Sequence, residues 1–587
     1  QGWVADDLLQ RKMLLTSPLP TLLKGLFAFV SPDKNLQFMD LSTNLGSMPW
    51  WTLDTLRISF FRPVAVLTHW LDYQLWPDSG VLMHAQSILW YGSVCILAAL
   101  VYRRLMGLTW VAGLAAFLFA VDIVHLGSVA WLANRNGLLA LFFGLLTLLA
   151  HDRWRREGSQ ASVLLASLWL ALALLSAETG VATGVYLLAY AIFLDRGTWR
   201  RRLSSLLPYA AVVGVWQLIY QYLGYGAWGS GFYVDPAREP VPFAAAVLER
   251  GPILLLSQWI GQIPMLYNLL SMPASHVAWL IVLVLLTLIG IVLLPLIRDD
   301  RVARFWATAM VIAVIPACSI SLLSGRVLLF AGLGAMGLMA QFIAGLFDRS
   351  GWLPLRRVWQ TPAWTLSLLL IGLHVILAPI LMPIIVNTPD AMQSVIAQVT
   401  DLGLPPEAEG QDVVIVNAPS AFHFIYVPSL RSIHDQPMPT HIRILAPGYS
   451  PVDVTRQDAH TIVVRPERGY LIQAGTRVGE NLDVLPPFHY VYMYQLLDKF
   501  FRSDAFPMTL GQRVELTGMR AEVIALTDDG RPSEARMRFS LPLEDLSLKW
   551  LQWDWEKSVY VPFTPPAVGK TVRIPGPSAS ITGGGGE

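Results

Sequence analysis

The chain has 587 residues, of which 54% are hydrophobic and 14% charged, and its formal net charge is +1. A soluble domain is typically about 25% charged, and the mean hydropathy of +0.50 indicates that lipid surrounds most of this chain. The composition argues against a cytosolic enzyme, a disordered scaffold and a nucleic-acid binder. Cys95 and Cys318 both lie in apolar runs, so neither a disulfide framework nor a zinc site is expected.

The first 80 residues precede the long apolar segments and include an aromatic-rich stretch, Phe60–Trp76, that predicts an interfacial helix. Ten apolar segments follow, each predicted to be a membrane helix because a bilayer core needs about 20 apolar residues in helical form. The second to the fifth are short and would need protein neighbours or tilt. The segments are Val81–Tyr102, Leu108–Val121, Gly137–Ala150, Ala161–Ser176, Val181–Leu194, Leu206–Leu223, Val277–Ile297, Phe305–Leu323, Val327–Leu346 and Trp364–Val386.

Every second connecting loop is rich in arginine. These loops follow the first, third, fifth, seventh and ninth segments, and the positive-inside rule places the loops in the cytoplasm. The other loops, including the first outer loop 1–80 and the outer loop 224–276, then lie on the opposite, outer side. One further span before Gln1 is expected, because the chain otherwise begins on the outer side without an anchor. The arginines concerned are Arg103, Arg104, Arg153, Arg155, Arg156, Arg196, Arg200, Arg201, Arg202, Arg298, Arg301, Arg304, Arg349, Arg356 and Arg357.

The composition changes after residue 386, which divides a membrane domain (1–386) from an outer domain (387–587). Short apolar runs between proline and glycine turns predict a mostly β, sandwich-like domain. Only Tyr490–Phe501 suggests a helical turn, and a flexible tail is expected over 576–587. Scattered histidines fit no metal motif, and the tryptophans at 550, 553 and 555 are typical of a core. The predicted strands are Asp412–Val416, Ile442–Ala446, Thr461–Arg465 and Ala535–Phe539.

Ionisable side chains gather on the outer side of the predicted topology, where such groups are costly and therefore candidates for function. A carboxylate can accept the proton of an acceptor hydroxyl, and arginines can hold a phosphate through charge-assisted hydrogen bonds. Together they suit transfer of a group from a phosphorylated lipid to a hydroxyl at the membrane surface. The candidates are Asp6, Asp7, Arg62, His69, Asp72, His84, Asp122, His125, Arg135, Glu178 and Arg326.

Each candidate also has a structural interpretation. Asp6 and Asp7 could cap a helix that begins at Leu8. Asp122 and Arg135 could pair within their own loop, and Arg326 could anchor a helix at the interface with its stem in lipid. Glu178 could be satisfied by backbone donors of its turn, and the histidines favour helix-end or aromatic-belt roles.

The order of these motifs resembles the GT-C superfamily of integral-membrane glycosyltransferases, in particular its protein O-mannosyltransferase-like members. The likeness covers about the first 350 residues, and the C-terminal domain lies outside it. The motifs that carry it are Trp3–Asp7, Phe61–Val64 continuing to Tyr73 and His84, Phe119–His125 continuing to Arg135, Ala177–Thr179 and Ser324–Val327.

The resemblance implies a GT-C-like bundle of about 10 or 11 membrane helices and a polyprenyl-phosphate-linked sugar as donor. By the same resemblance Asp7, or else Asp6, is the catalytic base. Asp122 is a second acid near the acceptor or a divalent cation such as Mg²⁺ or Mn²⁺, with Asp7 and Asp122 as its ligands. Arg326, together with Arg135 or Arg62, holds the lipid phosphate. Glu178, His84 and His125 support them.

Three departures from the family pattern bear on activity. Asp122-Ile123 stands where the family commonly has His-Pro, Ala177 replaces a lysine, and a histidine expected near Trp90-Tyr91 is absent. The leading hypothesis is an inverting hexosyltransferase that uses a lipid-phosphate sugar and a protein or glycan acceptor. The expected location is the bacterial inner membrane, with the C-terminal domain in the periplasm.

Two other functions remain open. The first is a GT-C-like subunit with weakened catalysis that scaffolds a protein partner through its C-terminal domain. A transporter is the second, although transporters usually show internal repeats and polar groups at the midplane.

Overall fold

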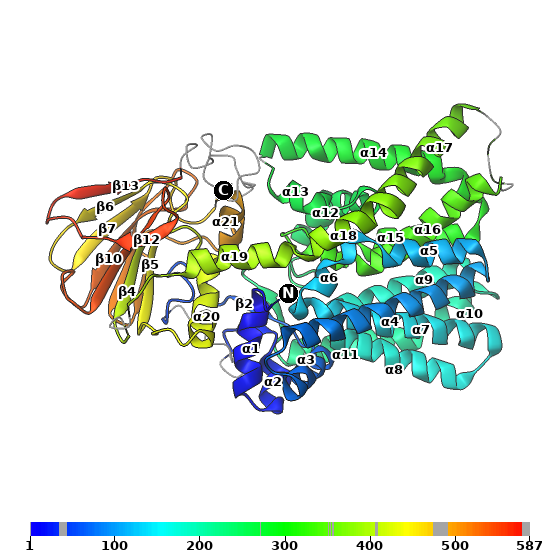
Figure 1. Ribbon diagram of the computed structural model, residues 1–587, viewed down its shortest axis with the longest axis horizontal. Coiled ribbons are helices and arrows are strands. Elements are labelled where there is room, and N and C mark those ends of the chain that lie inside the picture. Colours follow the sequence, from blue (N-terminus) through cyan, green and yellow to red (C-terminus); the bar gives the residue numbers. More distant parts are fainter. Residues whose placement is uncertain are drawn as a thin grey trace.

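The computed structural model describes residues 2–33, 44–270, 272–349, 352, 354, 357–405, 409–472 and 491–577. Figure 1 shows a helical bundle beside a sheet-rich C-terminal domain, with short helices and strands between them. We call the end of the bundle that faces this domain the domain end. The opposite end, which carries Arg104 and Arg156, is the arginine end.

All ten predicted apolar segments are helical. Among the described residues, eight helices are long and apolar enough to cross a membrane, and three shorter apolar helices accompany them. The chain is therefore an integral membrane protein. The helices are α4 (Gly80–Met106), α5 (Trp110–Ala120), α7 (Arg135–Glu157), α8 (Gln160–Ser176), α9 (Ala182–Phe193), α10 (Trp199–Ser204), α11 (Leu207–Tyr222), α14 (Met272–Asp299), α15 (Arg301–Ala313), α16 (Leu329–Phe347), α17 (Arg357–Leu370) and α18 (Ala378–Val386).

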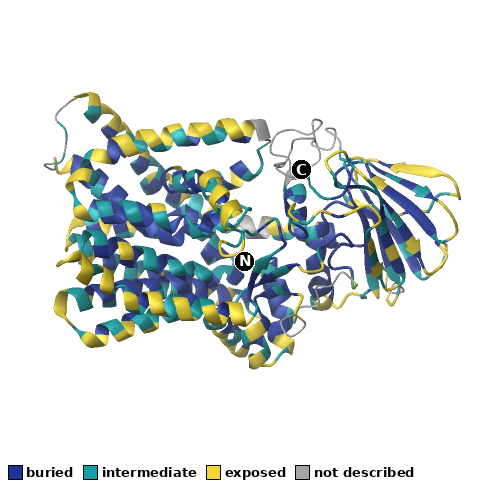
Figure 2. Cartoon of the chain, turned by 180° about the vertical axis from the view of Figure 1, so that it is seen from behind, coloured by how far each residue is buried: buried dark blue, intermediate teal, exposed yellow. Residues whose placement is uncertain are grey.

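Helix α16 forms the centre of the bundle. In its most apolar stretch 89% of the residues are buried, against 22% for the span that contains α14. Figure 2 shows the same contrast, with exposed residues along the outermost helices and buried residues between the inner ones. Apolar residues that stay exposed along a helix of this length are expected to face lipid.

One long helix was not predicted. Helix α12 (Pro240–Ile260) lies within the predicted loop 224–276, where prolines and the Glu249-Arg250 pair interrupt the apolar run. Its middle contacts the domain end, since Arg250 Nη1 donates to the carbonyl oxygen of Cys318 at 2.8 Å. Just beyond its end, Gln262 donates to the carbonyl oxygen of Ile123 at 2.7 Å. Although long and apolar enough to cross a membrane, α12 therefore lies along the domain end. It is joined to α14 by α13 (Ile263–Asn268).

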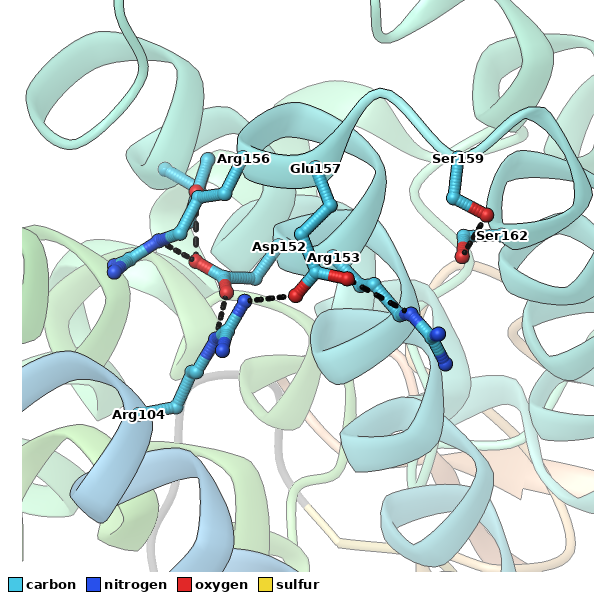
Figure 3. Close-up of polar contacts among 8 residues, drawn as sticks. Arg104, Asp152, Arg153, Arg156, Glu157, Ser159 and Ser162 are labelled. Carbon is cyan, nitrogen blue, oxygen red and sulfur yellow. Dashed lines mark hydrogen bonds and ion pairs between the residues drawn. The ribbon is translucent and has the colours of Figure 1, made fainter.

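The arginine loops meet at one end, as the topology predicts. Figure 3 shows the Asp152 carboxylate of α7 between Arg104 of α4 and Arg156 of its own helix. Glu157 accepts hydrogen bonds from Arg104 at 2.8 Å and from Arg153 at 3.1 Å. These loops therefore carry acids that pair with part of their positive charge.

The first 80 residues fold against the domain end. Helix α3 (Pro63–Leu75) confirms the helix expected within Phe60–Trp76. Three short strands form an antiparallel sheet that the sequence did not predict, because each has only three residues. The remaining elements are α1 (Asp6–Thr16), α2 (Leu19–Gly25), β1 (Ala28–Val30), β2 (Arg57–Ser59), β3 (Gly226–Trp228), the short helix α6 (Gly127–Ala130) and the 3-10 turns η1 (Ile123–His125), η2 (Leu132–Asn134), η3 (Glu178–Val181), η4 (Pro316–Ser319) and η5 (Gly325–Leu328).

The C-terminal domain contains two sheets. One is six-stranded, in the order β13-β6-β7-β10-β9-β8, and the other is four-stranded, in the order β12-β11-β4-β5. The four predicted strands are β4, β5, β7 and β10, which confirms a mostly β domain, although β4 pairs in parallel with β5 and β11. The strands are β4 (Asp412–Ala418), β5 (His441–Pro447), β6 (Val452–Arg456), β7 (Thr461–Pro466), β8 (Arg513–Leu516), β9 (Met519–Leu526), β10 (Pro532–Phe539), β11 (Leu548–Asp554), β12 (Val559–Pro562) and β13 (Thr571–Ile574).

Helices cover the side of this domain that faces the bundle. They are α19 (Thr388–Thr400), α20 (Val427–Ile433) after the 3-10 turn η8 (Ala421–Tyr426), and α21 (Val491–Asp498), which matches the helical turn expected within Tyr490–Phe501. The rings of Phe539 and Trp550, one from each sheet, lie 5.3 Å apart in the core. Most of the predicted tail, residues 578–587, lies outside the described residues.

The C-terminal domain shares its core with the first outer loop. The indole nitrogen of Trp50 donates to the carbonyl oxygen of Leu445 at 3.2 Å, and the amide of Ile442 donates to the carbonyl of Leu45 at 2.8 Å. Both strand residues belong to β5. Residues 44–53 therefore pack against the C-terminal domain, across the predicted division at residue 386.

Candidate functional site

A cavity of about 400 Å³ lies at the domain end, between the first outer loop and the ends of the bundle helices. Among the elements that line it are the end of α11, the turns η3, η4 and η5, the start of α1, and the loop after β3. Four of the predicted site residues line it. They are Asp6, Arg62, Glu178 and Arg326.

Arg326 lines this cavity without an ion pair to any carboxylate of the described residues, although its charge acts on Asp6. It lies in η5, where Ser128 Oγ donates to its carbonyl oxygen at 3.0 Å. Its guanidinium carbon stacks 4.6 Å from the ring centroid of Trp131. Among the described residues no carboxylate forms an ion pair with it, so its donors are available to an anion in the cavity.

Asp6 supplies a carboxylate to the same cavity from the first turn of α1. Its Oδ1 accepts a hydrogen bond of 3.0 Å from the hydroxyl of Tyr426 in the C-terminal domain. Burial raises the pKa of Asp6, while Arg326, the Tyr426 hydroxyl and Arg62 act in the opposite direction. A carboxylate with a raised pKa is a stronger base when it is ionised, which suits general base catalysis near neutral pH.

Arg62 and Glu178 form an ion pair at the cavity wall. Arg62 Nη2 lies 2.6 Å from Glu178 Oε2, and the hydroxyl of Tyr220 donates to the other carboxylate oxygen at 3.2 Å. The guanidinium also lies 4.4 Å from the ring centroid of Phe60. Arg62 is therefore held in one orientation beside the cavity, with its charge balanced by Glu178.

Asp7, the first choice for the base, points elsewhere. Its Oδ1 accepts from the backbone amide of Ala133 at 2.7 Å and its Oδ2 from that of Val4 at 3.0 Å. Burial raises its pKa to about 7. Because both oxygens face backbone donors, Asp7 does not line the cavity. Its position is that of a structural acceptor, which leaves Asp6 as the candidate base.

Arg135 is also withdrawn from the cavity. It is fully buried and pairs with Asp72, with 2.6 Å between Nη1 and Oδ2. Its remaining donors reach Ser87 Oγ at 3.0 Å and the carbonyl oxygen of Met83 at 2.8 Å. The expected phosphate contact from Arg135 is not retained, because these partners occupy its guanidinium.

Asp122 and His125 form a separate buried pair, with 3.2 Å between Oδ2 and Nε2. The other oxygen of Asp122 accepts from the amide of Val124 at 2.9 Å. Asp122 and Asp7 thus have different partners, and no group of three His, Cys, Asp or Glu residues that could hold a metal ion occurs in the described part of the chain. A divalent cation held by Asp7 and Asp122 stays a prediction. His84 Nε2 lies 3.1 Å from the carbonyl oxygen of Gly2 and likewise does not line the cavity.

Residues between 216 and 238 line a part of the cavity that the sequence patterns do not predict. Asp235 and Arg238 line it, with 3.9 Å between their charged groups. Both lie in a predicted outer loop, so the sidedness that singled out Asp6 and Arg326 could have identified them as well. Other polar and aromatic residues on this wall are Trp216, Gln217, Tyr220, Gln221, Tyr225 and Tyr233.

No family model and no curated protein matches the chain. Its fold is similar to the apo form of the oligosaccharyltransferase of Archaeoglobus fulgidus, with 11% identity and a TM-score of 0.38 over 76% of this chain and 60% of that one. It is also similar to ArnT of Cupriavidus metallidurans bound to undecaprenyl phosphate, with 14% identity and a TM-score of 0.37 over 76% and 86% of the two chains. With the apo state of ArnT from the same organism, the identity is 11% and the TM-score 0.33 over 76% of this chain and 86% of that one.

The chain thus spans less than two thirds of that oligosaccharyltransferase. At these identities and TM-scores, the likeness is a distant one and concerns the fold alone.

Proposed function

We propose that this chain is a membrane glycosyltransferase that moves a sugar from a polyprenyl-phosphate donor to a hydroxyl acceptor on the outer, periplasmic or luminal, face. The observation that carries the proposal is one cavity lined by both Arg326, a cation without an acidic partner among the described residues, and the partly buried carboxylate of Asp6. Such a pair can bind a phosphate and accept a proton within one reaction space.

The proposed reaction is a displacement at the anomeric carbon. The acceptor hydroxyl attacks this carbon as its proton passes to Asp6, and the bond from the carbon to the phosphate oxygen breaks. The polyprenyl phosphate leaves with the bonding electrons. Arg326 stabilises the charge that develops on the leaving phosphate, an electrostatic contribution that is often the largest in such sites. Attack opposite the leaving group inverts the anomeric configuration.

The membrane side of the cavity fits a lipid-linked donor. Helix α11 supplies Trp216, Gln217 and Tyr220 to the cavity, while only 17% of the most apolar stretch of the span that contains it is buried. A prenyl chain could therefore lie along α11 in the lipid while its phosphate reaches Arg326. The sugar would then occupy the wall formed by Gln217, Gln221 and Asp235, whose polar groups suit hydroxyls.

The test separates binding from chemistry. Native mass spectrometry of the full chain in detergent, with undecaprenyl phosphate as the probe, should show about tenfold weaker binding for Arg326→Gln, because one charge-assisted contact is lost. Asp6→Asn should bind the probe normally but lose transfer from polyprenyl-phosphate sugars by about 100-fold or more. Asp78→Asn is the control, an acid of the first outer loop whose side chain is 87% exposed. Transfer by Asp6→Asn at the unaltered rate would overturn the assignment.

A second candidate is a GT-C-like subunit without strong catalysis that scaffolds a protein partner through its C-terminal domain. Its specific support is Ala177, which lines the cavity where the resembling family has a lysine, so one cation is missing. The substitution at Asp122-Ile123 does not favour this candidate, since Asp122 lies outside the cavity. No transfer with any polyprenyl-phosphate sugar, together with a stoichiometric partner in native membranes, would favour the scaffold.

A further inference from the structure

The candidate base is contacted by residues from the far end of the sequence. Asp6 Oδ1 accepts the hydroxyl of Tyr426, a residue 420 positions away. Tyr426 ends η8, is 3% exposed, and its ring lies 6.1 Å from that of Phe422. Figure 1 shows α20, which follows Tyr426, beside α1, which Asp6 begins. A buried hydroxyl in a packed aromatic environment has little freedom to leave its acceptor.

The residue before Asp6 is held from the same side. Ala5 has a φ of 49° and a ψ of −115°, a backbone conformation that a residue with a Cβ rarely adopts and that persists only where the surroundings hold it. Its amide donates to Oε1 of Gln393 in α19 at 3.1 Å. Two side chains of the C-terminal region therefore contact consecutive residues at the start of α1.

The bundle holds the other side of this segment. The indole nitrogen of Trp131 donates to the carbonyl oxygen of Val4 at 3.1 Å. The same indole ring lies under the guanidinium of Arg326. The segment that presents Asp6 is thus fixed between the phosphate-binding candidate and the C-terminal domain.

We infer that the C-terminal domain is a positioning element of the site: Tyr426 and Gln393 hold the Asp6 carboxylate in the orientation that faces the cavity. Tyr426 and Gln393 are positioning residues, since they act on Asp6 and are not among the residues that line the cavity. The inference deepens the proposed function, because it rests on Asp6 as the base. It gives the C-terminal domain a defined role in the transfer step.

The contact also has an electrostatic consequence. A hydroxyl that donates to a carboxylate stabilises its ionised form. The other charged groups that act on Asp6 and Asp7 are Arg326, Arg62 and Arg135, together with the mutual repulsion of the two aspartates. Removing the hydroxyl leaves these unchanged, so Tyr426→Phe should raise the pKa of Asp6 by about one unit.

Infrared spectroscopy of the full chain in lipid nanodiscs can read this shift directly. The band of the protonated Asp6 carboxyl is identified by its loss in Asp6→Asn and then followed with pH. Tyr426→Phe should shift its titration upward by about one unit. Tyr560→Phe is the matched control, because it removes another buried hydroxyl of the same domain, one that donates to the carbonyl oxygen of Val399 at 3.1 Å. It should leave the Asp6 titration unchanged.

Kinetics supply the second readout. Tyr426→Phe should lower kcat by about tenfold with little change in KM for the lipid donor. The variant changes the orientation of the Asp6 carboxylate but leaves Arg326, which binds the donor, unaltered. Gln393→Ala should act in the same direction, and Gln393→Glu, which keeps an oxygen acceptor for the Ala5 amide, should restore much of the loss. An unshifted Asp6 titration with unchanged kcat in Tyr426→Phe would overturn the inference.

The two proposals fail differently. If Tyr426→Phe shifts the Asp6 titration but no variant, nor the unaltered chain, transfers a sugar, the contact stands and the proposed function falls. If Asp6→Asn abolishes transfer while Tyr426→Phe and Gln393→Ala leave both titration and kcat unchanged, the function stands and the positioning role falls.

Discussion

Two neighbouring aspartates have different partners because successive residues of a helix point in directions about 100° apart. Asp6 faces the cavity and Tyr426, whereas Asp7 faces the backbone amides of Val4 and Ala133. The Asp6 carboxylate thereby lines the cavity, while the Asp7 carboxylate joins the start of α1 to the bundle at Ala133.

Replacing Asp7 should therefore lower the stability of the fold more than it lowers the rate of transfer. An amide group at this position can accept at only one of its two polar atoms, so Asp7→Asn should lower the free energy of unfolding by about 1–3 kcal/mol. Thermal unfolding of the full chain in detergent measures this, with Asp6→Asn as the comparison. An Asp7→Asn variant as stable as Asp6→Asn would contradict the structural role.

The raised pKa of Asp7 also has a pH signature. Its pKa is about 7 in the folded chain against a usual 3.8, so the folded state binds more protons than the unfolded state between these values. Stability should then fall as pH rises through this range, because ionisation is penalised in the folded state. The slope of Tm against pH should be flatter in Asp7→Asn, and an unchanged slope would contradict the prediction.

At the scale of elements, the two ends of the bundle differ in how their helices are connected. The domain end uses 3-10 turns that present Glu178 and Arg326 to the cavity. The arginine end uses the ion pairs of Figure 3, where Asp152 of α7 joins α4 and α9 by accepting from Arg104 and from the hydroxyl of Tyr190 at 2.8 Å. Asp152 thus ties three helices together.

Asp152→Ala should separate these helices at the arginine end. The carboxylate is 3% exposed, but its arginine partners are 39% and 48% exposed, so the cost is moderated by solvent to about 1–2 kcal/mol. Glu157→Ala, whose side chain is 47% exposed, is the matched control and should cost little. The Tm in detergent measures both, and equal effects would argue against a role for burial at Asp152.

At the scale of the whole molecule, the first outer loop and the C-terminal domain form one packed unit. Trp50 and Trp51 lie against Tyr470, with ring centroids 5.0 and 5.5 Å apart. Arg502 donates to the carbonyl oxygen of Trp51 at 2.9 Å, across 451 positions. The outer domain is therefore held to the bundle by a core and by the contacts at Asp6.

Trp50→Ala should loosen this connection. Truncating a buried tryptophan typically costs about 3–5 kcal/mol, and here the loss falls on the contact between the first loop and β5. Limited proteolysis of the full chain should show faster cleavage within the first 80 residues. Trp199→Ala, at a side chain that is 56% exposed, is the control and should cleave at the unaltered rate.

Much of the membrane part was predictable because lipid imposes a local rule. A span must be long, apolar and helical to satisfy its backbone, so all ten apolar segments are helices and the arginine loops share one end. The β-rich character of the C-terminal domain was also readable from its short runs between turns. Helix α12 was missed because its prolines and its Glu249-Arg250 pair interrupt the apolar pattern.

Tertiary structure decided which charged residues face one another. The order of the apolar segments predicts that Asp6, Asp7, Arg135 and Arg326 lie on the same side of the membrane. Local patterns could not show that Arg135 forms an ion pair with Asp72, or that backbone amides donate to both oxygens of Asp7. Nor could they bring Tyr426 to Asp6, since contacts between distant positions depend on how domains pack. The low overall charge of this chain is thus a property of its sequence, whereas the cavity lined by both Asp6 and Arg326 is formed only by the tertiary fold.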